Sequence, residues 1–425
     1  MGTAAATLGR TSVKTIWFHM QGYRDLPEDF KQRYDSSWVT PPNRELCDPE
    51  QVRKYLHWNL DELEYADDLG FDGVGTNEHH SNVYGFPVSP TLTAATLARR
   101  TSDAAICILG TTLPTTMPMR VAEEIAWLDC MSGGRIIAGM PVGSAMDTCG
   151  VAGLPPDLVR PRWYEGMELI RQAWTRPGPF PFNGRFNKIR HVNPWPVPLQ
   201  KPHPPMWLAG GGSLETYHYA ARYDLAYSYL SFQGAKYAKA LMQGFWDVIE
   251  QSGLDDNPYR AGFAQFIAVA DTDAEAERLY GKHIENFYNK SMHIPPHFMM
   301  APGYVTKKSL ENMLAKAGSA SPFLTKQDPT FAETIASGAA ICGSPDTVAE
   351  QLIDAIKDLR IGHLVALMQI QSMPTDLTKH STKLFAEKVL PRLRELWPDH
   401  DDRWWPSGAT RNQVVRPKVP AGEVS

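Results

Sequence analysis

Cysteine is scarce in this chain of 425 residues, which contains five, widely spaced and without a CxxC pair. An odd and scattered set of this kind predicts reduced thiols and a cytoplasmic protein, not a disulfide scaffold. Long apolar runs are also lacking, since none approaches the roughly 18–20 residues of a membrane-spanning helix, and we expect no membrane insertion. Basic residues are not in excess either: 42 Lys and Arg against 47 Asp and Glu leave a net charge of −5, which argues against nucleic acid as a partner.

Several short motifs are absent, and each absence removes a class of chemistry. No GxxxxGK[ST] loop occurs, and the segment 73–78 lacks the third glycine of GxGxxG, so P-loop and classical dinucleotide folds are disfavoured. There is no GxSxG elbow, which leaves covalent hydrolase chemistry without support. No HExxH pair occurs either, so the zinc-binding spacing of metalloproteases is missing. The first 14 residues contain only short apolar pieces, from which we expect no export signal.

The sequence does contain a repeated alternation of short apolar runs and amphipathic helices. From Pro49 the apolar positions recur at spacings of three and four, and Gly70 follows where a left-handed helix end belongs. Strand, helix and strand in this order predict a parallel sheet. The expected strands are 15–20, 71–76, 104–110, 135–140, 205–211, 225–230, 262–270 and 361–368. Eight such units favour a (β/α)8 TIM barrel with excursions at the C-terminal mouth.

Two long segments interrupt the alternation. Residues 176–205 are rich in proline and indicate an ordered, semi-rigid excursion, whereas 285–335 looks like a segment that crosses the barrel mouth. We expect a single barrel domain over 1–398 and a polar, proline-rich tail over 399–425. Several tryptophans, Trp127 among them, occur at spacings typical of the core and are predicted to serve packing.

Glu78, His79 and His80 directly follow the second expected strand, at the end of a barrel strand where active sites lie. Adjacent residues of an extended chain point to opposite faces, so these three are not expected to bind one metal ion, and we predict no metal site. A histidine acting as general acid or base is more plausible, because its ordinary pKa near 6.5 suits proton transfer. A purely structural histidine is the alternative.

A second candidate is the run of small residues 209–213, between a strand and a short helix. Backbone N–H groups in such a turn, the helix N-terminus and the Ser213 hydroxyl could together hold a phosphate. Glycine-rich turns after strands are common, so a turn without a ligand is an equally good interpretation at this point.

Four blocks of the sequence resemble one known family in order and spacing. They are LEYADDLGFDGVGTNEHH (63–80), AEEIAWLDCMSGGR (122–135) with its flanking strands, PHPPMWLAGGGSLETYHYAARY (202–223) and ICGSPDTVAEQL (341–352). Together they resemble the bacterial-luciferase-like flavin-dependent monooxygenases over about residues 14–230 and 335–395. The resemblance implies a (β/α)8 barrel, which the alternation predicts independently.

The resemblance also assigns residues by their motifs. His79 matches the family's active-site histidine beside the flavin. The other matched positions are flavin contacts: Thr111 and Thr112 after the third strand, Gly139 to Ser144 after the fourth, Gly211, Gly212 and Ser213 as the phosphate turn, and, on a looser alignment, Arg162 and Tyr164 as ribityl or phosphate contacts. Met140-Pro141-Val142 replaces a more usual glycine-rich run, so the contacts of the ring are the least certain part of this assignment.

Members of this family mostly take reduced FMN from a separate NAD(P)H:flavin reductase, react it with O2 to a flavin (hydro)peroxide and oxygenate a small organic substrate. The resemblance therefore implies an FMNH2-dependent two-component monooxygenase, and a homodimer that associates through helices after the early strands. A deazaflavin-dependent oxidoreductase and a non-catalytic flavin-binding relative are alternatives within the same fold. A metal-dependent barrel hydrolase is a third. The sequence identifies neither the substrate nor the type of oxygenation.

Overall fold

The computed structural model describes residues 12–407 and 409, except 231, 300, 310 and 312–327. Eight parallel strands of this part form a closed ring, each hydrogen-bonded to the next, and the ring closes between β11 and β1. They are β1 Lys14–Phe18, β2 Gly73–Thr76, β3 Ala105–Leu109, β4 Ile136–Gly139, β7 Met206–Gly210, β8 Ala226–Tyr229, β9 Ala261–Val269 and β11 His363–Leu367. The (β/α)8 barrel predicted from the sequence is confirmed, and each of these strands falls at one of the eight expected runs.

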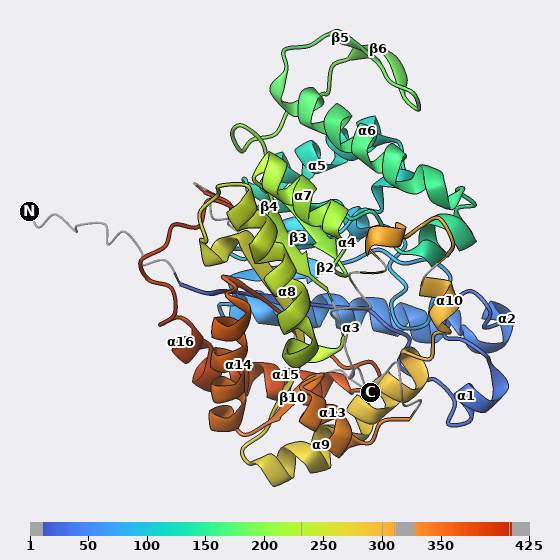
Figure 1. Ribbon diagram of the computed structural model, residues 1–425. Coiled ribbons are helices and arrows are strands. Elements are labelled where there is room, and N and C mark those ends of the chain that lie inside the picture. Colours follow the sequence, from blue (N-terminus) through green and yellow to red (C-terminus); the bar gives the residue numbers. More distant parts are fainter. Residues whose placement is uncertain are drawn as a thin grey trace, which may run out of the picture.

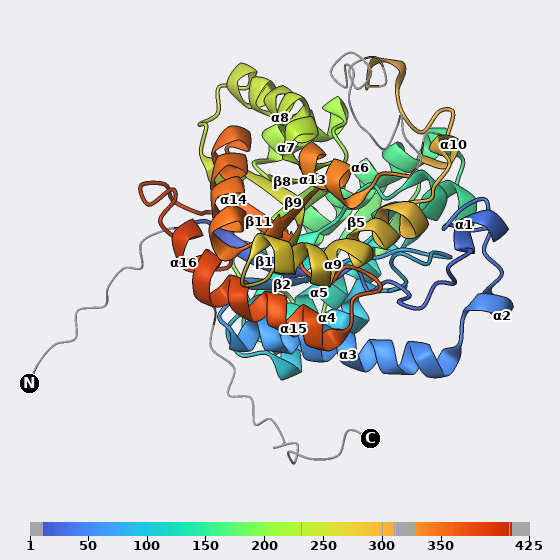
Figure 2. The same ribbon diagram turned by 90° about the horizontal axis from the view of Figure 1, so that it is seen from below.

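Helices surround the ring of strands (Figures 1 and 2). The longer ones are α3 Pro49–Asp68, α4 Pro90–Arg100, α5 Pro118–Ser132, α6 Pro156–Thr175, α7 Leu214–Tyr223, α8 Gly234–Gln251, α9 Asp273–Asn286, α14 Pro345–Leu359 and α15 Thr375–Leu384. Shorter ones are α1 Phe30–Arg33, α2 Asn43–Leu46, α10 Pro296–Met299, α13 Phe331–Ser337 and α16 Leu390–Leu393. Proline begins several of these helices, at the position where its missing N–H and fixed φ cost nothing.

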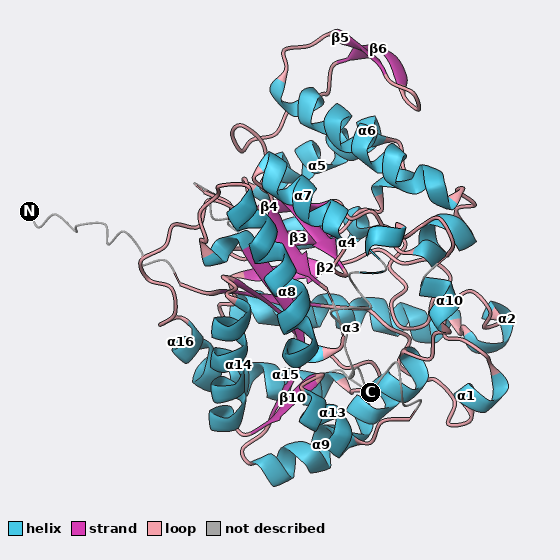
Figure 3. Ribbon diagram, viewed as in Figure 1, coloured by secondary structure: helices cyan, strands magenta, loops and turns pink. Residues whose placement is uncertain are grey.

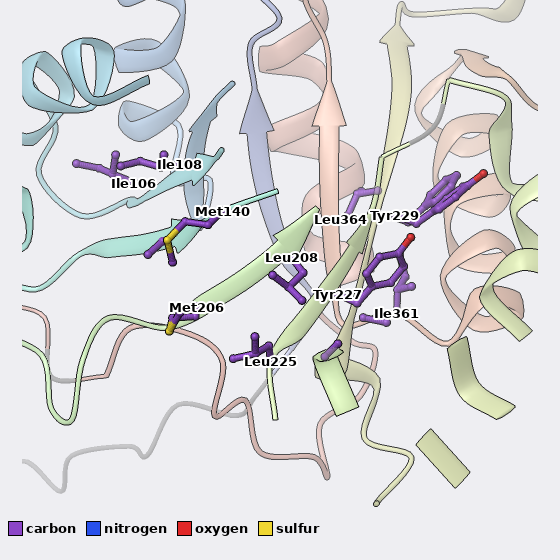
Figure 4. Close-up of a cluster of buried hydrophobic side chains, with 14 of the residues drawn as sticks. Ile106, Ile108, Met140, Met206, Leu208, Leu225, Tyr227, Tyr229, Ile361 and Leu364 are labelled. Carbon is purple, nitrogen blue, oxygen red and sulfur yellow. The ribbon is translucent and has the colours of Figure 1, made fainter. Parts of the chain in front are cut away.

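Alternate residues of each strand pack into two different hydrophobic layers. Ile106 and Ile108 of β3 belong to the layer between the barrel and its helices, whereas Cys107 and Leu109 belong to the cluster inside the barrel. Figure 4 shows part of the outer layer, in which Leu208 of β7 and Tyr227 of β8 come from neighbouring strands. Because both faces of every strand are covered, the strands read as continuous apolar runs. This is why the sequence reveals them.

Two elements of the sheet structure lie outside the predicted pattern. The proline-rich segment contains an antiparallel hairpin, β5 Phe180–Asn183 and β6 Lys188–Val192, which stands apart from the barrel (Figure 3). Glu165 of α6 accepts hydrogen bonds from the backbone N–H groups at the tip of this hairpin. A ninth parallel strand, β10 Ala340–Gly343, pairs with the carboxyl-terminal half of β9.

The two long excursions lie at opposite ends of the barrel. Segment 176–205 connects the end of α6 with the start of β7, and Gln200 hydrogen-bonds to Asp129 and to the carbonyl of Ile136 at the amino end of β4. The described part of 285–335 does cross the carboxyl-terminal mouth, where Tyr304 donates a hydrogen bond to the carbonyl of Gly143. Most of the expected tail, like the first eleven residues, lies outside the described residues.

Trp127 departs from its predicted packing role, because its side chain on α5 is 51% exposed. It lies on the same helix face as Arg120 and Glu124, and this charged face points away from the barrel. Within the described part of the chain, no helix combines the length and the apolar character that crossing a bilayer requires.

Candidate active site

His79 lies at the carboxyl end of β2, three residues beyond Thr76, and its side chain is 19% exposed. Its Nδ1 is 2.9 Å from Oδ2 of Asp147, which is the second residue of a π-helical segment, Met146–Val151. On the opposite side of the ring, Nε2 is 3.4 Å from the hydroxyl of Tyr84. A single π-helical turn is a common feature of functional sites, and here it carries the acidic partner of the histidine.

Aromatic rings enclose His79 on its remaining sides. Trp38 meets the imidazole edge to face with ring centroids 5.5 Å apart, and Tyr84 meets it at 5.0 Å. Burial, with a smaller contribution from the charge of Asp147, raises the pKa of Tyr84 well above its ordinary value, so this phenol keeps its proton. The corner can therefore exclude water around one histidine while retaining a neutral hydroxyl beside it.

Glu78 and His80 are directed away from His79 and pair with each other. Oε1 of Glu78 is 3.2 Å from Nε2 of His80, and Oε2 accepts a hydrogen bond from the backbone N–H of Thr112. The hydrogen bond to Glu78 raises the pKa of His80. Among the described residues, no three His, Cys, Asp or Glu side chains are arranged to hold a metal ion.

The ends of β3 and β4 complete this corner of the mouth. The N–H of Thr111 donates to the carbonyl of Gly139, and the hydroxyl of Thr111 is buried without a hydrogen-bond partner. Ser144 donates its hydroxyl hydrogen to Asp147. Gly143 has φ +90°, and a Cβ there would lie 2.4 Å from the methyl carbon of Thr112, so both backbone and space require glycine. The structure thus brings His79, Thr111, Thr112, Gly139 and Ser144 together at one corner of the mouth.

The second corner of the mouth is the turn after β7. Gly211 is exposed and has open space where a side chain would stand, whereas Gly212 is buried and its φ of +105° requires glycine. Ser213 precedes the first residue of α7, whose free N–H groups and dipole favour an anion. Arg160 of α6 reaches the same place: its guanidinium is 3.3 Å from the Ser213 hydroxyl and 3.5 Å from that of Thr216.

Arg160 is a residue that the sequence analysis missed in favour of Arg162. The Arg162 guanidinium lies over the ring of Phe186 in the hairpin, 5.0 Å from its centroid, and points away from the turn. Tyr164, one helical turn beyond Arg160, packs against Trp163 and Tyr219. Of these three α6 side chains, Arg160 is the one placed to meet a phosphate on Ser213.

A strap of residues 301–309 covers this second corner. Thr306 and Ser309 donate hydrogen bonds of 2.5 Å to the two carboxylate oxygens of Glu215, in the first turn of α7. Although burial opposes it, these hydrogen bonds lower the pKa of Glu215. With the bond from Tyr304 to Gly143, they hold the strap across the mouth.

A buried ionic cluster supports the mouth beneath the segment after β1. Glu62 of α3 lies 2.9 Å from both Nε2 of His19 and a guanidinium nitrogen of Arg24. Arg24 also donates to Asn59 and to the carbonyl of Met373, which follows β11. Burial lowers the pKa of His19, whereas the hydrogen bond from His19 and the charge of Arg24 outweigh burial and lower that of Glu62. The cluster ties three segments of the mouth together.

A cavity of about 320 Å³ adjoins the His79 corner on its outer side. Its lining includes Glu78, His80, Thr111 and Asp147 from the site, together with residues at the amino-terminal ends of α4 and α5. Asp147 is therefore among the residues that line a space large enough for small molecules.

The family model of the luciferase-like monooxygenases matches residues 37–361, about three quarters of the chain. The chain belongs to the luciferase-like monooxygenase family. Two relatives match over nearly their whole length. The alkanal monooxygenase alpha chain of Photobacterium leiognathi is 22% identical over 78% of this chain and 91% of that one. The 2,5-diketocamphane 1,2-monooxygenase 1 of Pseudomonas putida is 24% identical over 81% of this chain and 95% of that one.

Higher identities are confined to shorter matches. The oxygenase component of the flavin-dependent trigonelline monooxygenase of Acinetobacter baylyi is 29% identical over 39% of this chain and 46% of that one. An uncharacterized protein of Sinorhizobium fredii is 36% identical over 34% of this chain and 42% of its own length. The match to this chain spans less than half the length of each of these two relatives.

Several solved structures share the barrel. The monooxygenase RslO1 of Streptomyces bottropensis superposes with a TM-score of 0.66 at 20% identity, covering 89% of this chain and 99% of that one. The oxygenating constituent of 3,6-diketocamphane monooxygenase of Pseudomonas putida, in complex with FMN, superposes with a TM-score of 0.65 at 18% identity. The match covers 90% of this chain and 99% of that one. An F420-dependent secondary alcohol dehydrogenase superposes with a TM-score of 0.60 at 16% identity, covering 90% of this chain and 100% of that one. Identities this low establish the fold alone.

Proposed function

We propose that this protein is the oxygenase component of a two-component monooxygenase, which uses reduced FMN and O2 to oxygenate a small organic substrate. The observation that carries the proposal is the second corner of the mouth, where Ser213, Thr216 and Arg160 converge on the amino end of α7. A dianionic phosphate suits this set, because a guanidinium, hydroxyls and free backbone N–H groups are the donors that phosphates require.

The residues at the first corner suit the reactive part of a flavin. When bound, reduced FMN supplies the electrons that activate O2. The chain's own contribution is to hold the phosphate through Ser213 and Arg160, to exclude water with Trp38 and Tyr84, and to provide a proton acceptor at His79.

A separate reductase is part of this proposal. The relative from Acinetobacter baylyi is named as an oxygenase component, which supports the proposal that flavin reduction and oxygenation are carried out by two separate proteins. The described residues show no GxGxxG-type turn for a nicotinamide cofactor in addition to the phosphate turn. We propose that reduced FMN arrives from an NAD(P)H:flavin reductase.

We also propose a homodimer. Leu92 of α4, Met117 at the start of α5 and Trp127 of α5 expose apolar side chains by 67%, 59% and 51%. Thr91 of α4 hydrogen-bonds to Glu124 of α5, so the two helices form one continuous outer face. Exposed apolar residues on one outer face are typical of association surfaces, and a twofold axis through the face would pair it with itself.

The cofactor decides between the proposal and its main rival, since the F420-dependent neighbour shares the fold. An anaerobic fluorescence titration compares reduced FMN with reduced F420 on the purified protein. Saturable binding of reduced FMN, at micromolar or lower concentration and with no comparable response to F420, supports the proposal. Binding of F420 alone would replace it by a hydride-transferring oxidoreductase.

A further inference from the structure

Asp147 is a nearly fully buried carboxylate, 1% exposed, that three groups approach within hydrogen-bond distance. Oδ1 accepts a hydrogen bond of 2.9 Å from the backbone N–H of His80. Oδ2 accepts one of 2.8 Å from the Ser144 hydroxyl and lies 2.9 Å from Nδ1 of His79. Family resemblance assigned no role to this position, and the sequence analysis did not select it.

The chemistry of these contacts determines where His79 carries its proton. An ionised carboxylate only accepts hydrogen bonds, so the ring nitrogen facing Asp147 must be the one that bears hydrogen. Neutral His79 is therefore protonated on Nδ1, and its Nε2 keeps a free lone pair. That lone pair points toward Tyr84, whose hydroxyl at 3.4 Å is too distant for a strong hydrogen bond.

We propose that Asp147 is a positioning residue, which holds His79 in the Nδ1-protonated tautomer and keeps Nε2 available as a proton acceptor at the mouth. This inference rests on the proposed function for its catalytic meaning, although the tautomer itself does not depend on a bound flavin. When Nε2 accepts a proton from a group at the mouth, His79 becomes an imidazolium. The charge of Asp147 balances it, and Asp147 itself takes no proton.

The other polar groups around His79 do not provide the same restraint. Tyr84 faces Nε2, and Trp38 presents only its ring, because its indole N–H donates to the carbonyl of His80. Glu78 and His80, the chain neighbours, are paired with each other. Asp147 is thus the carboxylate in direct contact with the imidazole.

A purely architectural role is the competing explanation, because Asp147 also ties the segment after β2 to the segment after β4 through His80 N–H and Ser144. Such a role would leave the His79 tautomer unchanged as long as the protein folds. The tautomer is therefore the readout that separates the two roles.

The test is imidazole ¹⁵N NMR of ¹⁵N-histidine-labelled protein without flavin, with the His79 signals assigned by comparison with His79→Asn. In the parent protein we expect neutral His79 with hydrogen on Nδ1. In Asp147→Ala we expect hydrogen on Nε2 or a mixture of tautomers. In Asp147→Asn the amide oxygen takes the Oδ1 position, where it accepts from the backbone N–H of His80. The NH2 then takes the Oδ2 position facing Nδ1, and we expect the Nε2-protonated form. Unchanged Nδ1 protonation in either folded variant overturns the proposal.

Chemical rescue provides a second readout that a merely structural role would not move. The cavity beside Asp147 gives a small carboxylate access to the space that Asp147→Ala vacates. Formate should return the Nδ1-protonated tautomer in a saturable manner, whereas chloride at equal ionic strength should not. A tautomer that fails to respond to formate contradicts direct contact between the carboxylate and the ring.

Asp129→Asn is the matched control. Asp129 is also a fully buried aspartate, but it accepts from Gln200 at the opposite end of the barrel, so the variant should leave the His79 tautomer as in the parent. Once a substrate is known, Asp147→Ala should lower kcat by on the order of 10- to 100-fold, with a much smaller change in KM. If no variant or parent binds flavin while the tautomer responds as described, the proposed function fails and the inference about Asp147 stands.

Discussion

His79 and Arg160 are the two side chains on which the account of the mouth depends most. One lies in an aromatic corner against Asp147, and the other lies against the hydroxyls of a glycine turn. The first position suits proton transfer and the second suits phosphate binding. Substitution of His79 should therefore impair turnover, whereas substitution of Arg160 should impair flavin binding.

Replacing His79 with alanine should abolish turnover without abolishing flavin binding. A positioned general base contributes about 10² to 10⁴-fold to rate, whereas His79 makes none of the phosphate contacts proposed here. Turnover is measured as substrate-dependent O2 consumption, and binding by flavin fluorescence. Unchanged turnover in a folded His79→Ala protein would remove His79 from the mechanism.

Replacing Arg160 with alanine should weaken FMN binding by about 10- to 100-fold, since a hydrogen bond to a charged group contributes roughly 1.5–3 kcal/mol. Arg162→Ala is the matched control two residues away. Its guanidinium lies on Phe186 in the hairpin, so its effect on FMN affinity should be small. Equal losses in the two variants would contradict the assignment of Arg160.

The sequence could predict which loops carry the site but not every side chain in it. Helix periodicity cannot choose between Arg160 and Arg162, because they flank the buried face of α6, marked by Val159, Trp163 and Ile170, from opposite sides. Asp147 was missed because it lies in a π-helical segment, which has no signature in apolar spacing. Trp127 was predicted to pack from its spacing along the sequence, although Arg120 and Glu124 on its helix face indicate exposure.

At the scale of elements, the cluster of His19, Arg24 and Glu62 holds α3 and the segments after β1 and β11 around the mouth. Glu62→Gln leaves the Arg24 cation buried with a weaker partner, and we expect a loss of about 3–5 kcal/mol in stability. Thermal unfolding measures this loss. Glu50→Gln, in an exposed pair with Arg53, should change stability by less than about 0.5 kcal/mol.

The same cluster predicts the pH dependence of stability. The pKa of His19 is lowered from 6.5, so its contribution is present above about pH 6.5 and is lost as the pH falls below that value. The pKa of Glu62 is lowered from 4.5, so its contribution persists to lower pH and is lost below about 4.5. The temperature of the unfolding midpoint should therefore decrease as the pH falls below about 6.5 and again below about 4.5. Glu62→Gln should lack the decrease below about pH 4.5. A parent protein of constant stability from pH 7 to 4 would contradict this account.

The strap 301–309 is a second element with a measurable restraint. Glu215→Ala removes the acceptor for Thr306 and Ser309, so trypsin should cleave after Lys307 and Lys308 several-fold faster than in the parent. Glu311→Gln, which alters only an exposed pair with Lys307, is the control and should cleave at the parental rate. Equal rates in Glu215→Ala and the parent would show that these hydrogen bonds do not hold the strap.

The barrel strands were predictable because strands buried on both faces are continuous apolar runs, and glycines mark the ends of α3 and α5. The hairpin of β5 and β6 escaped prediction because its apolar residues alternate with prolines and charges in an exposed ribbon. β10, Ala340–Gly343, was missed because it is an addition to the eightfold alternation and pairs with β9 outside the ring. In each case the missed element is stabilised by tertiary partners instead of by its own pattern.

At the scale of the whole molecule, the outer face of α4 and α5 that exposes Leu92, Met117 and Trp127 should mediate self-association. Trp127→Glu removes a large apolar side chain from this face and should shift a dimer of about twice the 47.5 kDa chain mass to a monomer, as measured by light scattering after gel filtration. Leu56→Glu, at an exposed apolar position on α3, should leave the mass unchanged. A parent protein that is monomeric at all concentrations would contradict the proposed dimer.

The central claim concerns the barrel as a whole: that its mouth holds reduced FMN and governs the reaction of this flavin with O2. The most direct measurement is stopped-flow absorbance after mixing the anaerobic complex of protein and reduced FMN with O2. The account predicts a transient absorbance change and reoxidation kinetics distinct from those of free reduced FMN, altered in His79→Ala and diminished in Arg160→Ala at equal flavin concentration. Reoxidation at the rate of free reduced FMN, with no transient at protein concentrations that should saturate binding, would contradict it.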